Sequence, residues 1–542
     1  MTQPAPDPAL AAADPEHSTS PLAPFATPVF RMLWLAWLAA NITMWMNDVA
    51  AAWLMTTLTT SPVLVALVQT ASTLPVFLLG LPSGALADIL DRRRYFAGTQ
   101  LWVALNAVVL AVMSLADALS APVLLALTFT NGIGLALRWP VFAAIVPEIV
   151  PRHHMTQALA LNGVAMNLSR IVGPVVAGAI LAATSSAWVF VLNAVLAFTA
   201  FTLILRWKSQ HKESALPGER FIGAMRVGWQ HVMQSPRMRA VLLRIFLFFL
   251  QSTALMALLP LIAKSLHGGG PATFTVMLAC LGGGAVTAAL LFPKWRARFD
   301  RDQFVRYGTL VHAVMSLIVV FSPLVWIALP AMVVAGMAWI STANSLTISA
   351  QLALPNWVRA RGMSIYQMAL MGGSAAGSML WGQVAGLSSV RAAVIAAAVF
   401  GPVMLLLTRR VSVEGGGDED LTPAQPASVP EVAINVAPDD GPVMVTVEYM
   451  IDPARADDFA RVMQVTRRAR LRQGALTWAL LRDTSVPGRY VEYFVDENWV
   501  EHQRRLERFT AADIGLREQR LAFHLGGQPP RVKRYVAERS LD

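Results

Sequence analysis

Long apolar runs separated by short polar segments recur along the chain between residues 30 and 410. A helix needs about 20 mostly apolar residues to cross the hydrocarbon core of a bilayer, where only helices and closed barrels satisfy their own backbone hydrogen bonds. The runs therefore predict about twelve membrane-spanning helices in two sets of six. We place them near residues 30–57, 62–84, 95–116, 121–146, 158–183 and 186–207, and near 241–265, 271–292, 304–322, 327–352, 362–385 and 389–408.

The polar stretches outside these spans have different characters. Residues 1–28 contain no Lys or Arg, which excludes the basic start of a signal peptide and predicts a disordered cytoplasmic tail. Residues 411–441 are polar and rich in Gly and Pro, as in a flexible linker. Between the two sets, apolar residues at helical spacing predict an amphipathic helix on the cytoplasmic surface, with Phe221, Ala224, Met225, Gly228 and Val232 on one face.

The end of the chain alternates between strand and helix patterns. The segments VMVTVEYMI, GALTWALLRD, RYVEYFVDE and RVKRYVAE have the composition of strands. Apolar residues at helical spacing mark one helix after the first strand and a second helix after the third, the latter with Trp499, His502, Leu506 and Phe509. The order β-α-β-β-α-β predicts a small ferredoxin-like α+β domain.

These patterns predict an all-α membrane protein with a small cytoplasmic α+β domain. Its parts are a tail (1–28), an N-terminal six-helix half (29–207), a connection (208–240), a C-terminal six-helix half (241–410), a linker (411–441) and the α+β domain (442–542). Composition agrees, because 55% of the residues are hydrophobic and 14% are charged, against about 25% charged residues in soluble proteins.

The net charge of +10 comes from Lys and Arg in short loops, which favours a lipid bilayer over nucleic acid as the partner. When the loops are sorted alternately, nearly all of this charge lies on one side, and Lys264 and Arg391 lie on the other. Positive loops stay on the cytoplasmic side. We therefore expect a multi-pass protein of the cell (inner) membrane with both termini in the cytoplasm.

Several kinds of chemistry are absent from the sequence. Cys280 is the only cysteine, so an intrachain disulfide is excluded and a metal-thiolate cluster is not expected. The sequence contains no P-loop, no His-Glu-x-x-His site and no nucleophile elbow. We expect no cofactor, no metal and no enzymatic activity, and an ion gradient is the natural source of energy.

Two glycine pairs suggest that the two sets of six are a repeat. IVGPVVAG contains Gly173 and Gly178, and AAGSMLWG contains Gly377 and Gly382. The equivalent glycines are 204 residues apart (377 − 173 and 382 − 178), about half of the membrane region.

The loop after the second predicted span resembles the signature of the major facilitator superfamily. The matching residues are Gly84, Leu86, Asp88, Arg92, Arg93 and Arg94. The resemblance implies that the glycine allows close helix packing, and that Asp88 latches the cytoplasmic side through a helix N-terminus near Gly362. Ile89 and Asp91 depart from the family pattern. The alternative is that the three Arg are only a topogenic charge cluster.

The fifth predicted span resembles the Gly-Pro-rich fifth helix of exporters in this superfamily, through Gly173, Pro174 and Gly178. Proline removes a backbone donor and bends a helix, and glycine lets a neighbouring helix approach closely. The alternative is a proline kink with no bearing on the direction of transport.

Ionisable and amide residues within spans usually face a cavity or a partner. Asp48 is our candidate for proton coupling, because burial raises the proton affinity of a carboxylate; a structural ion pair with Arg170 is the alternative. The other candidates for the cavity are Arg138, Asn41, Asn167 and His312, and His312 also fits a simple packing role.

The tail resembles the antibiotic-biosynthesis-monooxygenase type of α+β barrel, and ENWVEHQRRLERFTAAD resembles the tail of transmembrane secretion effectors, the branch that includes relatives of the enterobactin exporter. Glu492, Glu501 and Arg508 invite a catalytic interpretation, but Trp499 and His502 fit packing on one helix face and Arg508 fits solvent. We expect self-association or protein docking through residues 442–542 instead.

Two functions follow from these features. The first is proton-driven efflux of a small molecule (a drug, siderophore or other metabolite) by alternating access. The alternative is a transporter-shaped sensor or secretion accessory that acts through its cytoplasmic domain.

Overall fold

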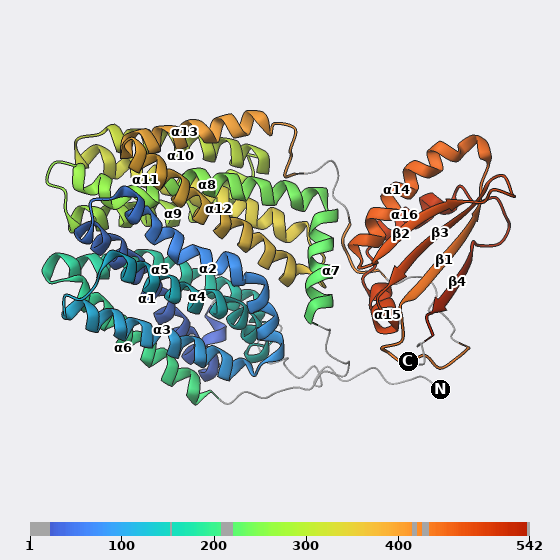
Figure 1. Ribbon diagram of the computed structural model, residues 1–542, viewed down its shortest axis with the longest axis horizontal. Coiled ribbons are helices and arrows are strands. Elements are labelled where there is room, and N and C mark those ends of the chain that lie inside the picture. Colours follow the sequence, from blue (N-terminus) through green and yellow to red (C-terminus); the bar gives the residue numbers. More distant parts are fainter. Residues whose placement is uncertain (1–21, 152–153, 208–220, 415–419, 425–432, 539–542) are drawn as a thin grey trace, which may run out of the picture.

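The computed structural model describes residues 22–151, 154–207, 221–414, 420–424 and 433–538. Twelve long helices form one bundle (Figure 1). Four of them begin with proline, which fits the first helical position because its missing N–H has no partner there anyway. The helices are α1 (Pro28–Leu58), α2 (Pro62–Ile89), α3 (Arg92–Leu115), α4 (Ala121–Ile149), α5 (Met155–Ala183), α6 (Ser186–Arg206), α8 (Pro236–Ser265), α9 (Pro271–Arg296), α10 (Arg301–Phe321), α11 (Val325–Leu352), α12 (Arg359–Leu387) and α13 (Val390–Leu407).

The bundle has two halves of six helices, α1–α6 and α8–α13, which lie side by side in Figure 1. A shorter helix, α7 (Phe221–Gln234), runs across one end of the bundle, and the C-terminal α+β domain lies beyond it. We call this the α7 end and the opposite side the far end. The prediction of two six-helix halves is confirmed.

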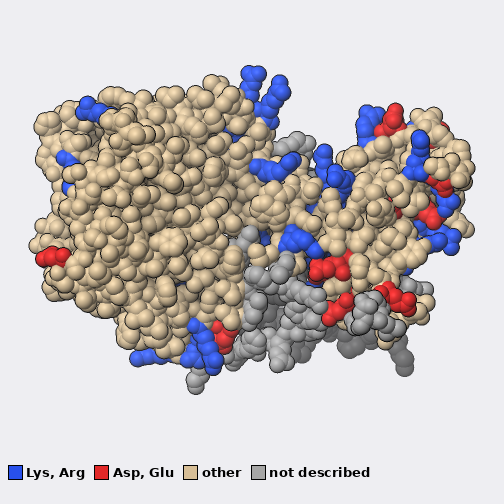
Figure 2. Space-filling model, in the orientation of Figure 1, with Lys and Arg blue, Asp and Glu red and all other residues tan. Residues whose placement is uncertain are grey.

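Eleven of the described helices are long and apolar enough to cross a bilayer. The helix outside this set is α12, which has 29 residues and carries several Gly and Ser in its middle. It packs against α2 and α8, so both of these neighbours cover its more polar surface. Figure 2 shows that Lys and Arg gather near the ends of the bundle and on the C-terminal domain, while the long sides are almost free of charge.

The two halves meet along α2 with α12 and along α5 with α9. At the far end one continuous hydrophobic cluster contains residues of both halves, including Met46 and Leu258. Lys264 adds a polar contact there, because its Nζ donates to the carbonyl oxygen of Thr56 at 2.6 Å. At the α7 end the described side chains form two separate clusters, one around Phe142 in the first half and one around Tyr366 in the second. Among the described residues, the far end is therefore where apolar side chains of the two halves pack into one cluster.

The C-terminal domain has four strands, β1 (Val443–Met450), β2 (Thr477–Arg482), β3 (Arg489–Asp496) and β4 (Arg531–Val536). They form an antiparallel sheet in the order β2-β3-β1-β4. Helix α14 (Ala456–Arg472) follows β1, and α15 (Trp499–Glu507) and α16 (Ala511–Leu521) follow β3. The predicted ferredoxin-like domain is confirmed.

One helix predicted after β3 is instead two. The chain breaks at Thr510, whose side chain and that of Asp513 form a reciprocal capping box that starts α16. A Thr followed three residues later by an acidic residue is a helix-start signal, and it was visible in the sequence.

Helix α7 was predicted, and its buried face overlaps the predicted one at Gly228 and Val232 but extends to one side of it. Val227, His231 and Val232 are buried, as is Gly228, whereas Trp229 on the other side is exposed. The side chains of Phe221 and Ala224, and the predicted tail up to residue 21, lie outside the described part of the structure. The buried face extends because α7 packs against a membrane helix and against the C-terminal domain, not against lipid alone.

Candidate functional site

Asp48 lies on α1 among the membrane-spanning segments. Its Oδ1 accepts a hydrogen bond from Ser72 Oγ of α2 at 3.1 Å. Neither Arg170 nor Arg138, both of which are described, forms an ion pair with it, so the pair with Arg170 considered from the sequence is not formed in this conformation. Among the described residues, Asp48 therefore has one neutral hydroxyl donor and no compensating cation.

Arg170 on α5 lies between two tryptophans from different halves. Its guanidinium carbon is 5.6 Å from the ring centre of Trp45 on α1 and 5.0 Å from that of Trp339 on α11. Its Nε and Nη1 atoms are buried, and no residue in the described part of the chain accepts a hydrogen bond from them. A guanidinium held by aromatic faces, with donors still unused, is equipped to take an anionic or carbonyl group.

Arg138 on α4 is fully buried within the first half and is anchored to α1. Its Nη1 donates to the carbonyl oxygen of Ala40 at 2.8 Å, and its Nη2 donates to Asn41 Oδ1 at 3.4 Å. The guanidinium also lies over the Trp37 ring at 5.2 Å. The structure thus brings Arg138 and Asn41 together, as a pair that fixes α4 to α1.

Two small cavities lie inside the halves at matching places. One is lined by Asn47, Asn131, Asn193 and Arg138 in the first half, and the other by Arg244, Gln251 and Thr309 in the second. Asn47 and Gln251 are 204 residues apart (251 − 47), the spacing of the glycine repeat. Both cavities therefore occur at equivalent positions of α1 and α8.

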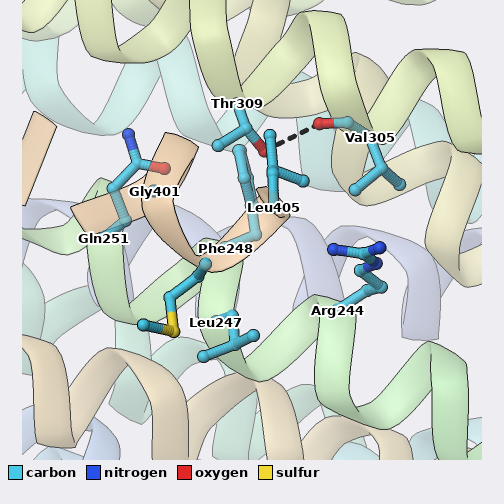
Figure 3. A pocket seen from close by; sticks show the side chains of 9 residues that line it. Arg244, Leu247, Phe248, Gln251, Val305, Thr309, Gly401 and Leu405 are labelled. Atoms are coloured by element: carbon cyan, nitrogen blue, oxygen red, sulfur yellow. Dashed lines mark hydrogen bonds between the residues drawn. The ribbon is translucent and has the colours of Figure 1, made fainter. Parts of the chain in front are cut away.

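Figure 3 shows the second-half cavity, with Gln251 and Arg244 reaching it from α8 and Thr309 donating to the carbonyl oxygen of Val305 at 2.7 Å. The amide N and O of Gln251 are buried and have no hydrogen-bond partner among the residues that the structure describes. The amide N and O of Asn193 in the first-half cavity are likewise buried and have no partner among the described residues. Buried polar atoms of this kind are usually hydrogen-bonded to water.

The other two cavity candidates are His312 and Asn167. His312 on α10 is buried and packs edge-on against Phe248. Its Nδ1 lies 3.4 Å from Ser316 Oγ, within hydrogen-bonding distance. These contacts lie within the second half, which supports its packing role. Asn167 is half-buried on α5, three residues before Arg170.

The glycines of the fifth span mark close helix contacts, and the repeat holds in three dimensions. A Cβ on Gly173 would lie 2.5 Å from Trp45 Cβ of α1, and one on Gly377 would lie 2.4 Å from the Leu250 carbonyl oxygen of α8. A Cβ on Gly178 would overlap Thr275 of α9, and one on Gly382 would lie 2.6 Å from Ala66 Cβ of α2. Each pair therefore joins equivalent helices in the two halves, and Pro174 lies inside α5 beside Gly173.

The loop motif spans the end of α2 and the start of α3. The surroundings of Gly84 and the side chain of Asp88 lie outside the described part of the structure, so the latch stays a prediction. Leu86 is exposed. Arg92, Arg93 and Arg94 form the first turn of α3; Arg93 Nη2 donates to the carbonyl oxygen of Leu205, and the backbone N of Arg94 donates to Asp91 Oδ1 at 2.8 Å. Asp91, which departs from the family pattern, is thus the N-cap of α3.

The C-terminal domain holds a buried charge network that sequence reasoning saw only in part. Glu492 is fully buried and accepts from Arg470 Nε and Trp478 Nε1, both at 3.0 Å, and from the Tyr449 hydroxyl at 3.2 Å. Burial alone would raise the pKa of Glu492, but Arg470 and its hydrogen bond outweigh burial, and the pKa is lowered. These three hydrogen bonds hold the Glu492 carboxylate against its own domain rather than offering it to a ligand.

His502 and Trp499 are both buried on one face of α15, as predicted. His502 Nδ1 lies 2.7 Å from Asp496 Oδ2, and Arg505 Nε donates to the same carboxylate at 3.0 Å. Burial, helped by the charge of Arg505, lowers the pKa of His502. The expectation that Arg508 lies in solvent is wrong, because its side chain is 5% exposed and packs against the membrane part.

Comparison with known proteins agrees with this architecture. Residues 19–541 match the family described as transmembrane secretion effector. The chain is 24% identical to the Staphyloferrin A transporter of Staphylococcus aureus over 251 residues, 46% of this chain and 63% of that protein. It is 25% identical to Macrolide efflux protein A of Streptococcus pyogenes over 269 residues, 48% of this chain and 65% of that protein. The matches span less than two thirds of the length of these two relatives.

Solved structures show the same fold. The inward-facing, unoccupied structure of a bacterial homologue of the human lysosomal transporter Spinster has a TM-score of 0.57 and 16% identity, over 72% of this chain and 98% of that one. The nucleoside transporter NupG has a TM-score of 0.60 and 11% identity, over 71% of this chain and 99% of that one. With the family match over almost the whole length and the fold of the bundle, this chain is an integral membrane protein that belongs to the transmembrane secretion effector family of the major facilitator superfamily.

Proposed function

We propose that this protein exports a small molecule across the cell membrane by alternating access, driven by protons. The observation that carries the proposal is Asp48, a carboxylate among the membrane helices that, within the described residues, accepts a hydrogen bond from Ser72 and is paired with no cation. A carboxylate that lacks a fixed cation takes up and releases a proton at moderate cost, which is what coupling to a proton gradient requires. The similarity to the Staphyloferrin A transporter and to Macrolide efflux protein A supports export.

The exported molecule would contact Arg170 between the halves. This side chain contacts Trp45 of the first half and Trp339 of the second, so its contacts change when the two halves move relative to one another. Its unused Nε and Nη1 donors would bind an anionic or carbonyl group, and the two rings would pack on apolar surface. Asn167, on the same helix, is placed to add an amide contact.

In the proposed orientation the α7 end faces the cytoplasm, because the loop Arg residues and the C-terminal domain lie there. The far end is sealed by the shared hydrophobic cluster and by the contact of Lys264 with Thr56. This conformation would load substrate from the cytoplasm. The reverse step requires the far-end cluster to separate as the α7 end closes.

The test is the accumulation of ethidium and of radiolabelled citrate in cells that lack their own efflux pumps. The wild-type protein should lower the accumulation of at least one probe, and a protonophore or Asp48→Asn should restore it. Asp117→Asn, the same change in the exposed loop between α3 and α4, is the control and should export normally. Export that survives Asp48→Asn would show that coupling lies elsewhere.

A protein that inserts and folds but moves no probe would instead favour a sensor or secretion accessory. In that case deletion of residues 433–542 should abolish the secretion phenotype, and Asp48→Asn should leave it intact.

A further inference from the structure

The C-terminal domain packs against the bundle through a defined surface. Helix α7 contacts α14 of the domain on one side, and α2, α8 and α12 of the bundle on the other. It therefore touches both halves and the domain at once. Figure 1 shows α7 standing between the bundle and the domain.

The centre of this surface is Trp357, in the turn between α11 and α12. Arg508 at the end of α15 lies over its ring at 5.0 Å, and the His231 ring of α7 meets the same tryptophan edge-on at 5.3 Å. Arg508 is held in place by Nη1 donating to the Gln473 carbonyl oxygen at 2.9 Å and Nη2 donating to Glu501 Oε2 at 2.8 Å. Arg508 is therefore preorganised by its own domain to stack on a residue of the membrane part.

Two further polar contacts tie α7 to the domain. Arg226 Nη2 and Glu497 Oε2 form an ion pair at 2.7 Å. His231 Nδ1 donates to the Arg472 carbonyl oxygen at 3.2 Å, at the end of α14. The contact uses backbone as well as side chains, so it depends on the fold of the domain and not only on surface charge.

Gly474 lets the two surfaces come this close. Its φ of +113° lies in the region that favours glycine, and a Cβ there would lie 2.9 Å from Arg508 Nη1 and 3.2 Å from Val227 Cγ2 of α7. A larger residue would push the domain away from α7. The turn after α14 is therefore shaped for this interface.

The chain that leads to the domain is fixed at both of its described ends. Arg244 donates to the carbonyl oxygens of Thr408 and Val411, and Asp302 accepts from Ser412 and Val413, which pins the exit of α13. On the domain side, residues 420–424 bond to the corner between α15 and α16. Residues 414 and 420 are six steps apart, which limits their separation to about 20 Å. So short a tether keeps the local concentration of the domain at this surface high.

We propose that the C-terminal domain is a conformational clamp, which by docking on α7 and Trp357 favours the arrangement of the two halves seen in this structure, with the halves packed together at the far end. The surface comprises elements from both sides of the bundle, so closure of this end would shift α7 and Trp357 relative to one another and weaken the contacts with the domain. This proposal builds on the proposed alternating access, because a clamp on one state sets how often the other is reached.

The test uses distances between spin labels in the full-length protein with Cys280→Ser. Labels at Arg409→Cys and Arg467→Cys report docking, and labels at Arg206→Cys and Arg409→Cys report the separation of the halves at the α7 end; all three sites are exposed. Arg508→Ala and Arg226→Glu should each lengthen the first distance. In the same variants, the fraction of molecules with a shorter second distance should increase about fivefold. This is the effect expected from a loss of about 1 kcal/mol of docking energy.

Arg461→Ala, a change on the exposed side of α14, is the matched control and should alter neither distance. The pair Arg226→Glu with Glu497→Arg should restore both distances, which rules out misfolding as the cause. Undocking without any change between the halves would overturn the clamp, and so would a wild-type domain that is not docked. Neither readout requires transport, so failure of the efflux assay would be recognised separately.

Discussion

Arg170 and Trp339 form a contact that crosses the boundary between the two halves of the bundle, with the guanidinium carbon 5.0 Å from the ring centre. Because Trp45 holds the same guanidinium from the first half, the position of Trp339 relative to Arg170 changes whenever the halves move. A cation between two rings, away from water, is stabilised by up to about 2 kcal/mol. The contact therefore stabilises the packing of the two halves, and a bound ligand could compete with the tryptophan rings for the Arg170 guanidinium.

Removing this contact should lower both stability and export. We expect Trp339→Leu and Arg170→Gln each to lower the melting temperature of the purified protein. The double variant should lose less free energy of unfolding than the two single variants together, by about 1 kcal/mol, because each single change already removes the same interaction. Arg170→Gln should also abolish export of the transported probe.

The control for this prediction lies on the same helix. Trp326 at the start of α11 is 82% exposed, so Trp326→Leu should leave the melting temperature and export close to those of the wild type. Additive losses from Trp339→Leu and Arg170→Gln would contradict the direct contact.

Docking of the C-terminal domain should weaken in acid. Burial, together with the charges of Arg472 and Arg508, lowers the pKa of His231 to about 3 in the docked protein. When the domain is undocked, His231 should titrate near its ordinary value of about 6.5. Below that pH the undocked state binds more protons than the docked state. The equilibrium constant for docking is therefore largest above a pH of about 6.5 and falls about tenfold for each pH unit below it.

The spin-label pair at positions 409 and 467 measures this effect at pH 7.5 and pH 5.5. The docked population should fall at the lower pH in the wild type. His231→Gln keeps a donor for the Arg472 carbonyl oxygen but does not titrate, so its docked population should stay constant. A wild-type docked population that is unchanged by pH would show that His231 stays accessible to protons or does not contribute to docking.

The charge at Glu492 should be essential for the folded C-terminal domain. Glu492→Gln leaves Arg470 buried without its counter-ion, and loss of one partner of a buried pair costs about 3–5 kcal/mol. Pulse proteolysis of the full-length protein in urea should show the domain cleaved at a much lower urea concentration. Glu448→Gln, on the neighbouring strand, removes a partner of the half-exposed Arg489 and should cost less than about 1 kcal/mol.

Helices α9 and α11 pack so closely at Gly284 that an added side-chain carbon should destabilise the protein. A Cβ on Gly284 would lie 1.9 Å from the Val333 carbonyl oxygen, which is backbone and cannot rotate away. Gly284→Ala should therefore force the helices apart and cost about 1–3 kcal/mol, seen as a lower melting temperature and less monodisperse protein. Gly283→Ala is the control, because a Cβ at that neighbouring position would meet nothing within 4 Å. Equal behaviour of the two variants would refute the close approach.

Much of this architecture could be predicted, because it depends on local pattern. The apolar runs specify the spans since each span must satisfy its own backbone and contact lipid along its length. The alternation of side chains predicted the four strands, and the glycines at 173, 178, 377 and 382 marked real helix contacts. Ionisable residues such as Asp48 and Arg170 could be singled out because charge is costly within a membrane.

The partners of those residues were decided by tertiary structure. Nothing local to Arg508 distinguishes it from a solvent-facing arginine, and it is buried because Trp357, some 150 residues earlier in the chain, lies against it. The buried face of α7 extends to Val227 and His231 because the helix is covered by the domain as well as by α12. Hydropathy and charge thus determined which segments cross the membrane and where strands form, since these follow from each segment's own solvation. Packing between distant segments decided which polar groups are paired, since a buried group takes whatever partner the fold brings to it.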